Sequence, residues 1–513
     1  MRPVLLVLAL LLAAPGQAQW DQVSTPFTTA GAAPSFGMQG VFRVRTDLDA
    51  NLDLDRGPTP SGELLFPAPA SDPQNGQILL GADMRLRLQP RVSYKGIALH
   101  ALVDVLDNLA LGSTPHPAAA SSVVTGQDPP RFGVNSLVDA VAIKRVWGEA
   151  ALPVGMLAVG RMPNHWGLGL VANNGLCDEC DGADSADRVA FVTPLLGHLW
   201  GVGFDWSASG PVTERDGRWL DREPRDDVRS ASAMVLNTLP DPALQRKLRA
   251  GKLVLHYGLI GSLRWQDREA LSAGQDDALV WIDRGFTGGL VDGWVRLRWA
   301  GLRVEAEFAY LGARYDNASL LPGVRLNQPA TAQQWGGAIE TEWRADDELW
   351  HLGLDLNVAS GDPAPGFGAR EMSRLGAPGD LDGAQVHPPY DLAVDNFRFH
   401  PDHHLDRILW RQIVGTFTDG VALRARAGLS PLRGLSLELW AVGSAALFAE
   451  SAPGHSNLLG IELDPTVRYR SNDGFELLLA YGVLFPLDGL ASVENQLAAS
   501  PGQTLRVMTR FAF

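Results

Sequence analysis

Two cysteines and the acidic residues around them form the densest group of reactive side chains in the sequence. Cys177 and Cys180 are the only cysteines of the 513-residue chain, and they enclose Asp178 and Glu179. A zinc site would need four ligands, and only His165 lies nearby. A thioredoxin-like role would need a surrounding sequence pattern that is missing here. We therefore expect a small local disulfide, Cys177–Cys180, in a loop of an exported protein.

The same stretch carries carboxylates of the type that calcium prefers. The candidate ligands, with Glu179 beside them, are Asp178, Asp181, Asp184 and Asp187. Calcium takes six to eight oxygen ligands, but the spacing departs from the EF-hand loop because no Glu closes it. The sequence therefore leaves two alternatives for residues 163–186, a calcium site or a solvated acidic loop.

A second cluster combines imidazoles with carboxylates. It consists of His400, Asp402, His403, His404 and Asp406. Imidazole with carboxylate suits a transition metal. The alternative is an exposed, His-rich loop of an exported protein without a metal.

Charged residues that alternate with apolar ones form the third candidate set. In Asp83 to Tyr94, for example, Arg85 and Arg87 alternate with Leu86 and Leu88, which is a strand period. The residues predicted in this way to line a pore are Arg85, Arg87, Arg91, Arg296, Arg298, Arg303, Glu305, Glu307, Glu340, Glu342, Asp355, Arg424, Arg426, Glu438, Glu462, Asp464, Arg468, Arg506 and Arg510. Rings of charge in a pore steer ions. Arg–Glu ladders that stabilise the wall are the alternative.

The strands that carry these residues are joined by short and long connections in turn. Short turns with long loops at the other end are typical of an outer-membrane barrel, whereas a soluble sandwich has no reason for that rhythm. We predict an all-β fold, a transmembrane antiparallel up-and-down barrel of 18 strands, with 16 as the alternative. Residues 228–239 and 252–265 supply the middle pair of strands, around a helix at 241–250. We expect Trp281 to Phe286 to belong to a loop.

The two ends of the chain have export features. Residues 1–18 resemble a signal peptide, with Arg2, an apolar run from Val4 to Ala14 and small residues before the cleavage point. We expect 19–35 to be a periplasmic leader and 36–513 to form a single barrel in the outer membrane. The last strand ends on Phe513, as in Gram-negative outer-membrane barrels, where the assembly machinery is thought to read that residue. Further expected partners are outer-membrane lipid, lipopolysaccharide and a small polar solute.

Several segments resemble alginate-export-type outer-membrane channels. They are Gly160-Arg-Met-Pro-Asn-His-Trp-Gly-Leu-Gly169, Ser360-Gly-Asp362, Phe399-His-Pro-Asp-His403 and the stretch from Gly460-Ile-Glu-Leu-Asp464 to the terminal strand. The resemblance implies 18 strands and a channel for sugars or small solutes. It does not imply alginate in particular, because the predicted inward arginines are interleaved with carboxylates.

The composition narrows the function further. A net charge of −15 argues against nucleic acid as a partner. There is no Gly-x-Ser-x-Gly motif and no evident Ser/His grouping, so we do not expect an enzyme. The predicted function is passive, substrate-selective diffusion of sugars or anions. The alternatives are a structural or adhesive surface barrel whose lumen is plugged, with residues 358–416 as plug or surface domain, and a barrel hydrolase.

Overall fold

The computed structural model describes most of the chain. The described residues are 33–62, 78–111, 141–210, 214–215, 218–219, 223–273, 278–319, 324–345, 349–364, 366–368, 379–381, 383 and 391–513. The predicted signal peptide, residues 1–18, and nearly all of the predicted leader, 19–35, lie outside them. Within the described residues, no helix has the length and hydropathy needed to span a bilayer.

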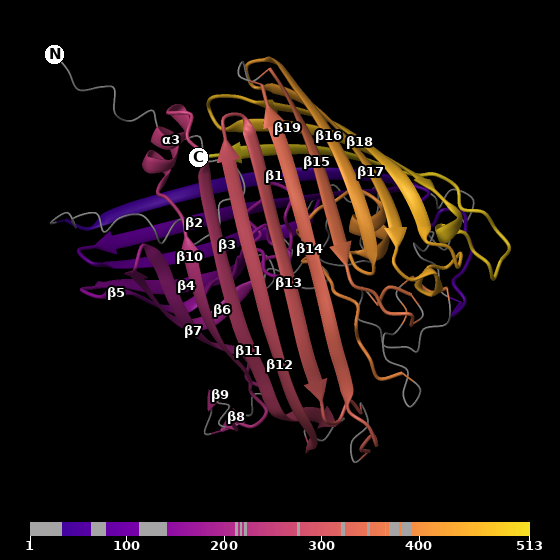
Figure 1. Ribbon diagram of the computed structural model, residues 1–513, viewed down its shortest axis with the longest axis horizontal. Coiled ribbons are helices and arrows are strands. Elements are labelled where there is room, and N and C mark those ends of the chain that lie inside the picture. Colours follow the sequence, from indigo (N-terminus) through magenta and orange to yellow (C-terminus); the bar gives the residue numbers. More distant parts are fainter. Residues whose placement is uncertain are drawn as a thin grey trace, which may run out of the picture.

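The described residues fold into one closed antiparallel barrel (Figure 1). Its strands are β1 (Ser35–Ala50), β2 (Ile78–Tyr94), β3 (Ile97–Ala110), β4 (Val141–Leu152), β5 (Gly155–Pro163), β6 (Ser185–Leu195), β7 (His198–Ala208), β10 (Val228–Asn237), β11 (Val254–Ala273), β12 (Ala278–Trp299), β13 (Leu302–Tyr315), β14 (Ala330–Arg344), β15 (Trp350–Ala359), β16 (Gly420–Leu432), β17 (Leu435–Ala446), β18 (Leu458–Arg470), β19 (Phe475–Pro486) and β20 (Gly502–Ala512). Each strand pairs with its neighbours in the chain, and β1 pairs with β20 to close the cylinder. The prediction of 18 strands is confirmed.

Few other elements are present in the described part of the chain. A small hairpin of β8 (Glu214–Arg215) and β9 (Arg218–Trp219) lies between β7 and β10. Helix α3 (Asp241–Arg249) joins β10 to β11, where the sequence predicted a helix between the middle pair of strands. Three short helical turns are η3 (Leu409–Val414), a π-helix, and the 3₁₀ turns η4 (Ala449–Ser451) and η5 (Asp488–Leu490).

The prediction for Trp281 to Phe286 was wrong. These residues belong to β12, which continues the barrel wall and pairs with β11 along Trp281↔Ala270 and Phe286↔Gln266. Gly285 within this stretch has a φ of 55°, and the β11–β12 register shifts between Gln266 and Arg268. Glycine with a positive φ is common in turns, but here Gly285 accompanies an irregularity within a paired strand.

The two faces of each strand differ as lipid and water would require. On β13, Glu305 is 1% exposed, whereas Phe308 and Tyr310 on the other face are 55% and 43% exposed. Exposed tryptophans gather toward both ends of the strands. One group, near the short turns, comprises Trp200, Trp299, Trp343 and Trp350, and the other, toward the opposite ends of the strands, comprises Trp206, Trp281 and Trp335. An apolar outer wall between two aromatic girdles is the surface of a membrane-spanning barrel.

Candidate functional site in the barrel lumen

The charged residues predicted to line a pore all lie on the strand face opposite the exposed apolar side chains. Many of them pair with one another across neighbouring strands. Asp355 on β15 binds Arg424 at 2.8 Å and Arg426 at 2.7 Å on β16, and Arg303 on β13 reaches Glu340 on β14 at 3.1 Å. These contacts are the wall-stabilising ladders that the sequence left as an alternative. That the same side chains line a conducting pore stays a prediction.

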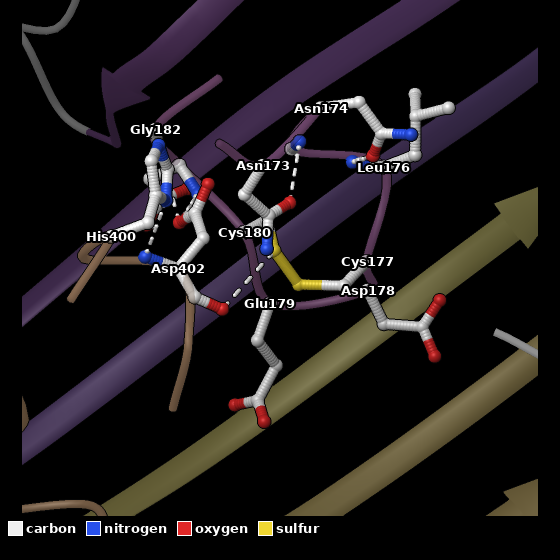
Figure 2. Close-up of a disulfide and its surroundings, with 12 residues drawn as sticks. Asn173, Asn174, Leu176, Cys177, Asp178, Glu179, Cys180, Gly182, His400 and Asp402 are labelled. Carbon is white, nitrogen blue, oxygen red and sulfur yellow. Dashed lines mark hydrogen bonds between the residues drawn. A yellow bond between two sulfur atoms is a disulfide. The ribbon is translucent and has the colours of Figure 1, made fainter. Parts of the chain in front are cut away.

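One inserted segment, residues 164–184, connects β5 to β6 and lies inside the barrel. We call it the disulfide segment, because Cys177 and Cys180 are bonded in it with their Cα atoms 5.1 Å apart. Figure 2 shows Asp178 and Glu179 projecting from the disulfide ring in different directions. Asp181 follows directly after the ring. We call Asp178, Glu179 and Asp181 the acidic tip.

Each carboxylate of the acidic tip lies within ion-pair distance of three arginines. Asp178 contacts Arg468 at 2.9 Å, Arg470 at 2.7 Å and Arg510 at 3.0 Å; Glu179 contacts Arg506 at 3.1 Å, Arg407 at 3.4 Å and Arg411 at 3.7 Å; Asp181 contacts Arg43 at 2.8 Å, Arg45 at 2.5 Å and Arg85 at 3.5 Å. The wall arginines among them come from β18, β20, β1 and β2, which lie together at the seam where the barrel closes. The acidic tip is therefore held by charge on that wall.

The arginine contacts keep Glu179 and Asp181 of the tip ionised. Burial alone would raise the pKa of Glu179, but the guanidinium groups of Arg411, Arg407 and Arg506 outweigh it and hold that pKa well below its ordinary value. Burial likewise opposes ionisation of Asp181, yet Arg43 and Arg45 lower its pKa. These two carboxylates consequently remain negatively charged across the physiological pH range.

The other end of the disulfide segment is attached to a different wall. Trp166 is 4% exposed and packs into an apolar cluster with Val192, Met234, Leu236 and Trp294, on β6, β10 and β12. Gly258 on β11 leaves the space that the indole occupies, because a Cβ there would lie 2.8 Å from the Cη2 atom of Trp166. The Trp166 site on β10 to β12 lies half-way around the barrel from β20 and β1.

Backbone contacts add to this second attachment. The amide of Leu170 donates to Glu307 on β13 at 3.3 Å, and the amide of Leu168 donates to the same carboxylate. Because β13 and the β20–β1 seam face each other across the lumen, the disulfide segment crosses the barrel from wall to wall.

A second inserted segment, residues 391–419, follows β15 and leads into β16. We call it the aromatic segment. Phe417 stacks edge-on against Phe399 and Trp410, with ring centroids 4.9 and 4.8 Å apart. This group packs on small inward residues of the wall, including Ala422 and Ala446. The sequence allowed residues 358–416 to be either a plug or a surface domain. Phe399 and Trp410, which belong to this region, lie inside the barrel.

A wall carboxylate also holds the aromatic segment. Glu462 on β18 accepts hydrogen bonds from three consecutive backbone amides at 2.8, 2.8 and 3.1 Å, those of Arg407, Ile408 and Leu409. These amides precede or begin the π-helix η3, where intrahelical acceptors are lacking. Glu307 and Glu462, both predicted to be inward, therefore bind the backbone of the two inserted segments.

The predicted metal ligands have other partners in this structure. Asp178 and Asp181 bind arginines, Asp187 pairs with Arg161 at 2.7 Å, and Asp184 lies 3.3 Å from His400. Among the described residues, no group of three or more His, Cys, Asp or Glu side chains is arranged to hold a metal ion. The calcium site at Asp178, Asp181, Asp184 and Asp187 stays a prediction that this geometry does not support.

The histidine cluster is likewise dispersed. His403 lies 3.3 Å from the amide oxygen of Asn357, and Asp402 accepts from the amides of Asp181 and Gly182, both at 3.1 Å. Burial lowers the pKa of His403 to about 4, which leaves the imidazole neutral at physiological pH. His403 thus connects the aromatic segment to the wall. Asp402 connects it to the disulfide segment, beside Cys180 and Gly182 (Figure 2).

Sequence reasoning missed several luminal residues. Arg43 and Arg45 alternate on the first strand, a pattern that could have placed them in the predicted set. Trp166 and Arg407 lie in irregular segments without a period, so no local pattern indicates where their side chains point. Their roles follow only from contacts with residues far away in the chain.

Comparison with known proteins gives no family. No protein-family model matches the chain, and no curated protein matches it. Similar solved structures include a BenF-like porin from Pseudomonas fluorescens (10% identity, TM-score 0.46, covering 94% of this chain and 100% of that one), OccK11 from Pseudomonas aeruginosa (11%, 0.45, 93% and 96%) and OccAB2 from Acinetobacter baumannii (10%, 0.45, 93% and 98%). Likeness at this level says nothing about solute or mechanism.

Proposed function

We propose that the protein is an outer-membrane channel for small polar or charged solutes, sugars or anions, and that the disulfide segment is its removable gate. The observation that carries this proposal is the crossing of the lumen by residues 164–184, with a charged tip on one wall and the buried indole of Trp166 on the other. Ion pairs and backbone hydrogen bonds can be exchanged for contacts with water, so the main loss when this segment leaves the lumen is the burial of a few apolar side chains, chiefly Trp166 and Leu170.

The aromatic segment has a different role in this proposal. Its buried residues include Phe399, Ile408, Trp410 and Phe417, packed against alanines of the wall. Burying one such aromatic side chain stabilises by about 1.5–3 kcal/mol, and moving the segment into water would lose several of these terms at once. The aromatic segment is therefore a permanent filling that narrows the lumen, beside which solutes pass when the gate is open.

The plugged surface barrel is the second candidate, and the apolar packing of the aromatic segment favours it. Planar-bilayer conductance separates the two. The informative variant carries Asp178→Asn, Glu179→Gln and Asp181→Asn, which remove the charges of the acidic tip while nearly preserving its shape. Asp187→Asn is the matched control, because Asp187 pairs with Arg161 and contacts none of the arginines that hold the tip.

We expect infrequent openings of the wild-type protein and of the control, and frequent or larger openings of the tip variant. If the refolded wild-type, tip variant and control all stay closed at every voltage, the protein is a plugged barrel. Heat-modifiable migration in gels shows that each variant has formed its barrel, so that a closed channel is not confused with an unfolded chain.

A further inference from the structure

Three arginines of the seam lie directly opposite one another in the β-sheet register. Arg43 on β1 faces Arg85 on β2, and on its other side it faces Arg510 on β20. Like charges directly opposite each other on neighbouring strands are destabilising. A row of this kind persists only if anions compensate it, and in this structure the acidic tip supplies two of them, Asp181 and Asp178.

The arginines of the seam outnumber the carboxylates that the wall provides to neutralise them. We define the arginine strip as the seven wall arginines that contact the tip, Arg43, Arg45, Arg85, Arg468, Arg470, Arg506 and Arg510. Among the described residues of the wall, three carboxylates lie within ion-pair distance of this strip, Asp47, Asp83 and Glu476. When the tip leaves, seven guanidinium groups therefore face three carboxylates.

Part of this strip lacks hydrogen-bond acceptors even with the tip in place. Arg43 is 1% exposed and Arg85 is 5% exposed. Among the described residues, the Nε and Nη1 atoms of Arg43 and the Nη1 atom of Arg85 have no hydrogen-bond partner. A buried guanidinium with unused donors is a strong site for a carboxylate or phosphate, which accepts two parallel N–H bonds.

We propose that the arginine strip is a binding site for a soluble multivalent anion, and that such an anion opens the gate by replacing the acidic tip. This inference rests on the proposed function, since it names the ligand that moves the disulfide segment. The ligand class is an oligocarboxylate or oligophosphate, because several linked charges can reach more than one member of the row formed by Arg85, Arg43 and Arg510. Chloride or acetate carries only one charge and compensates one position.

The disulfide reports whether the tip has left, independently of any current. Cys180 is fully buried when the tip is seated, and its carbonyl accepts from Arg85 at 3.0 Å. The oxidised protein in detergent is treated with dithiothreitol, a neutral reductant that does not itself compete for arginines. Alkylation and mass spectrometry then follow the reduction of Cys177–Cys180 in citrate and in acetate at equal ionic strength.

We expect saturating citrate to accelerate reduction by about tenfold or more over acetate, because the anion shifts the population toward the displaced tip. In the tip variant described above, reduction is fast in both buffers and citrate binds more tightly, since its internal competitor has been neutralised. Arg43→Gln with Arg85→Gln weakens citrate binding, whereas Arg161→Gln, in the pair outside the strip, leaves it unchanged.

Equal reduction rates of the wild-type protein in citrate and acetate overturn the inference, and this comparison needs no variant. Conductance distinguishes this failure from that of the proposed function. A tip variant that conducts while citrate leaves the wild-type disulfide protected refutes ligand displacement alone. A citrate-released tip in a protein that never conducts refutes the channel and keeps the anion site.

Discussion

Trp166 holds one end of the disulfide segment, and its removal is the sharpest test of the gate. The indole is 4% exposed and packs against Leu236 and Trp294, beside the space left by Gly258. Truncating a buried tryptophan to alanine costs about 3–5 kcal/mol in well-packed sites. The barrel strands keep their hydrogen bonds in Trp166→Ala. We therefore expect the substitution to destabilise the closed position of the segment relative to the open one, and not the barrel.

A loss of about 3–5 kcal/mol corresponds to roughly two to four powers of ten in the closed-to-open equilibrium. Single-channel recording in planar bilayers measures this change as open probability, and reduction of Cys177–Cys180 by dithiothreitol measures it in detergent. Trp206→Ala is the matched control, because Trp206 lies on the outer face of β7 and is 46% exposed.

The reasoning fails if Trp166→Ala has the open probability and the disulfide reactivity of the wild-type protein. It also fails if Trp206→Ala changes both readouts as strongly, since the effect would then come from the barrel wall. If Trp166→Ala strongly increases disulfide reactivity but no current is seen, Trp166 does attach the segment to the wall, and the protein is a plugged barrel.

Three further predictions concern the acidic tip, the titration of the disulfide segment and the closure of the barrel. Asp402→Ala removes the acceptor of the Asp181 and Gly182 amides and should loosen the tip by about 1–3 kcal/mol, seen as faster disulfide reduction, whereas Asp402→Asn keeps an acceptor oxygen and should lose less. Burial lowers the pKa of His165 to about 4, below the ordinary value of about 6.5, and arginines lower the pKa of Glu179 and of Asp181. The displaced disulfide segment therefore binds more protons than the seated one between about pH 6.5 and 4, and amide exchange in 164–184 should speed up as pH falls through this window; exchange independent of pH there, after correction for intrinsic rates, would contradict it. Gly40→Ala places a Cβ 2.2 Å from the ring of Phe513, which must then move. Because that side chain is 67% exposed and can turn away, we expect only a small loss of thermal stability, and none in the double variant with Phe513→Ala.

The regular wall could be read from the sequence because its physics is local. In a strand, side chains alternate between two faces, so the position of Arg85 beside Leu86 already determines that they face opposite environments. The rhythm of short turns and long loops then indicated a barrel, and parity led to 18 strands with the middle pair at β10 and β11. The predicted inward residues from Arg85 to Arg510 follow from the same period.

Counting strands did not reveal where each strand begins. Residues 281–286 were assigned to a loop because the number of strands was already even without them. In the structure, β11 extends to Ala273 and supplies hydrogen-bond partners for that part of β12. Pairing with a neighbouring strand outweighs a weak local preference, and the partner is invisible in the residues themselves.

By itself, the sequence determined the period, the strand count and which charges face inward, because each depends on neighbours along the chain. Only the tertiary structure decided what fills the barrel. Asp178 meets Arg468 and Arg510, and Trp166 meets the wall on the opposite side, through contacts between residues far apart in the chain. Such contacts form when the cylinder closes and brings β20 beside β1, so no local pattern can encode them.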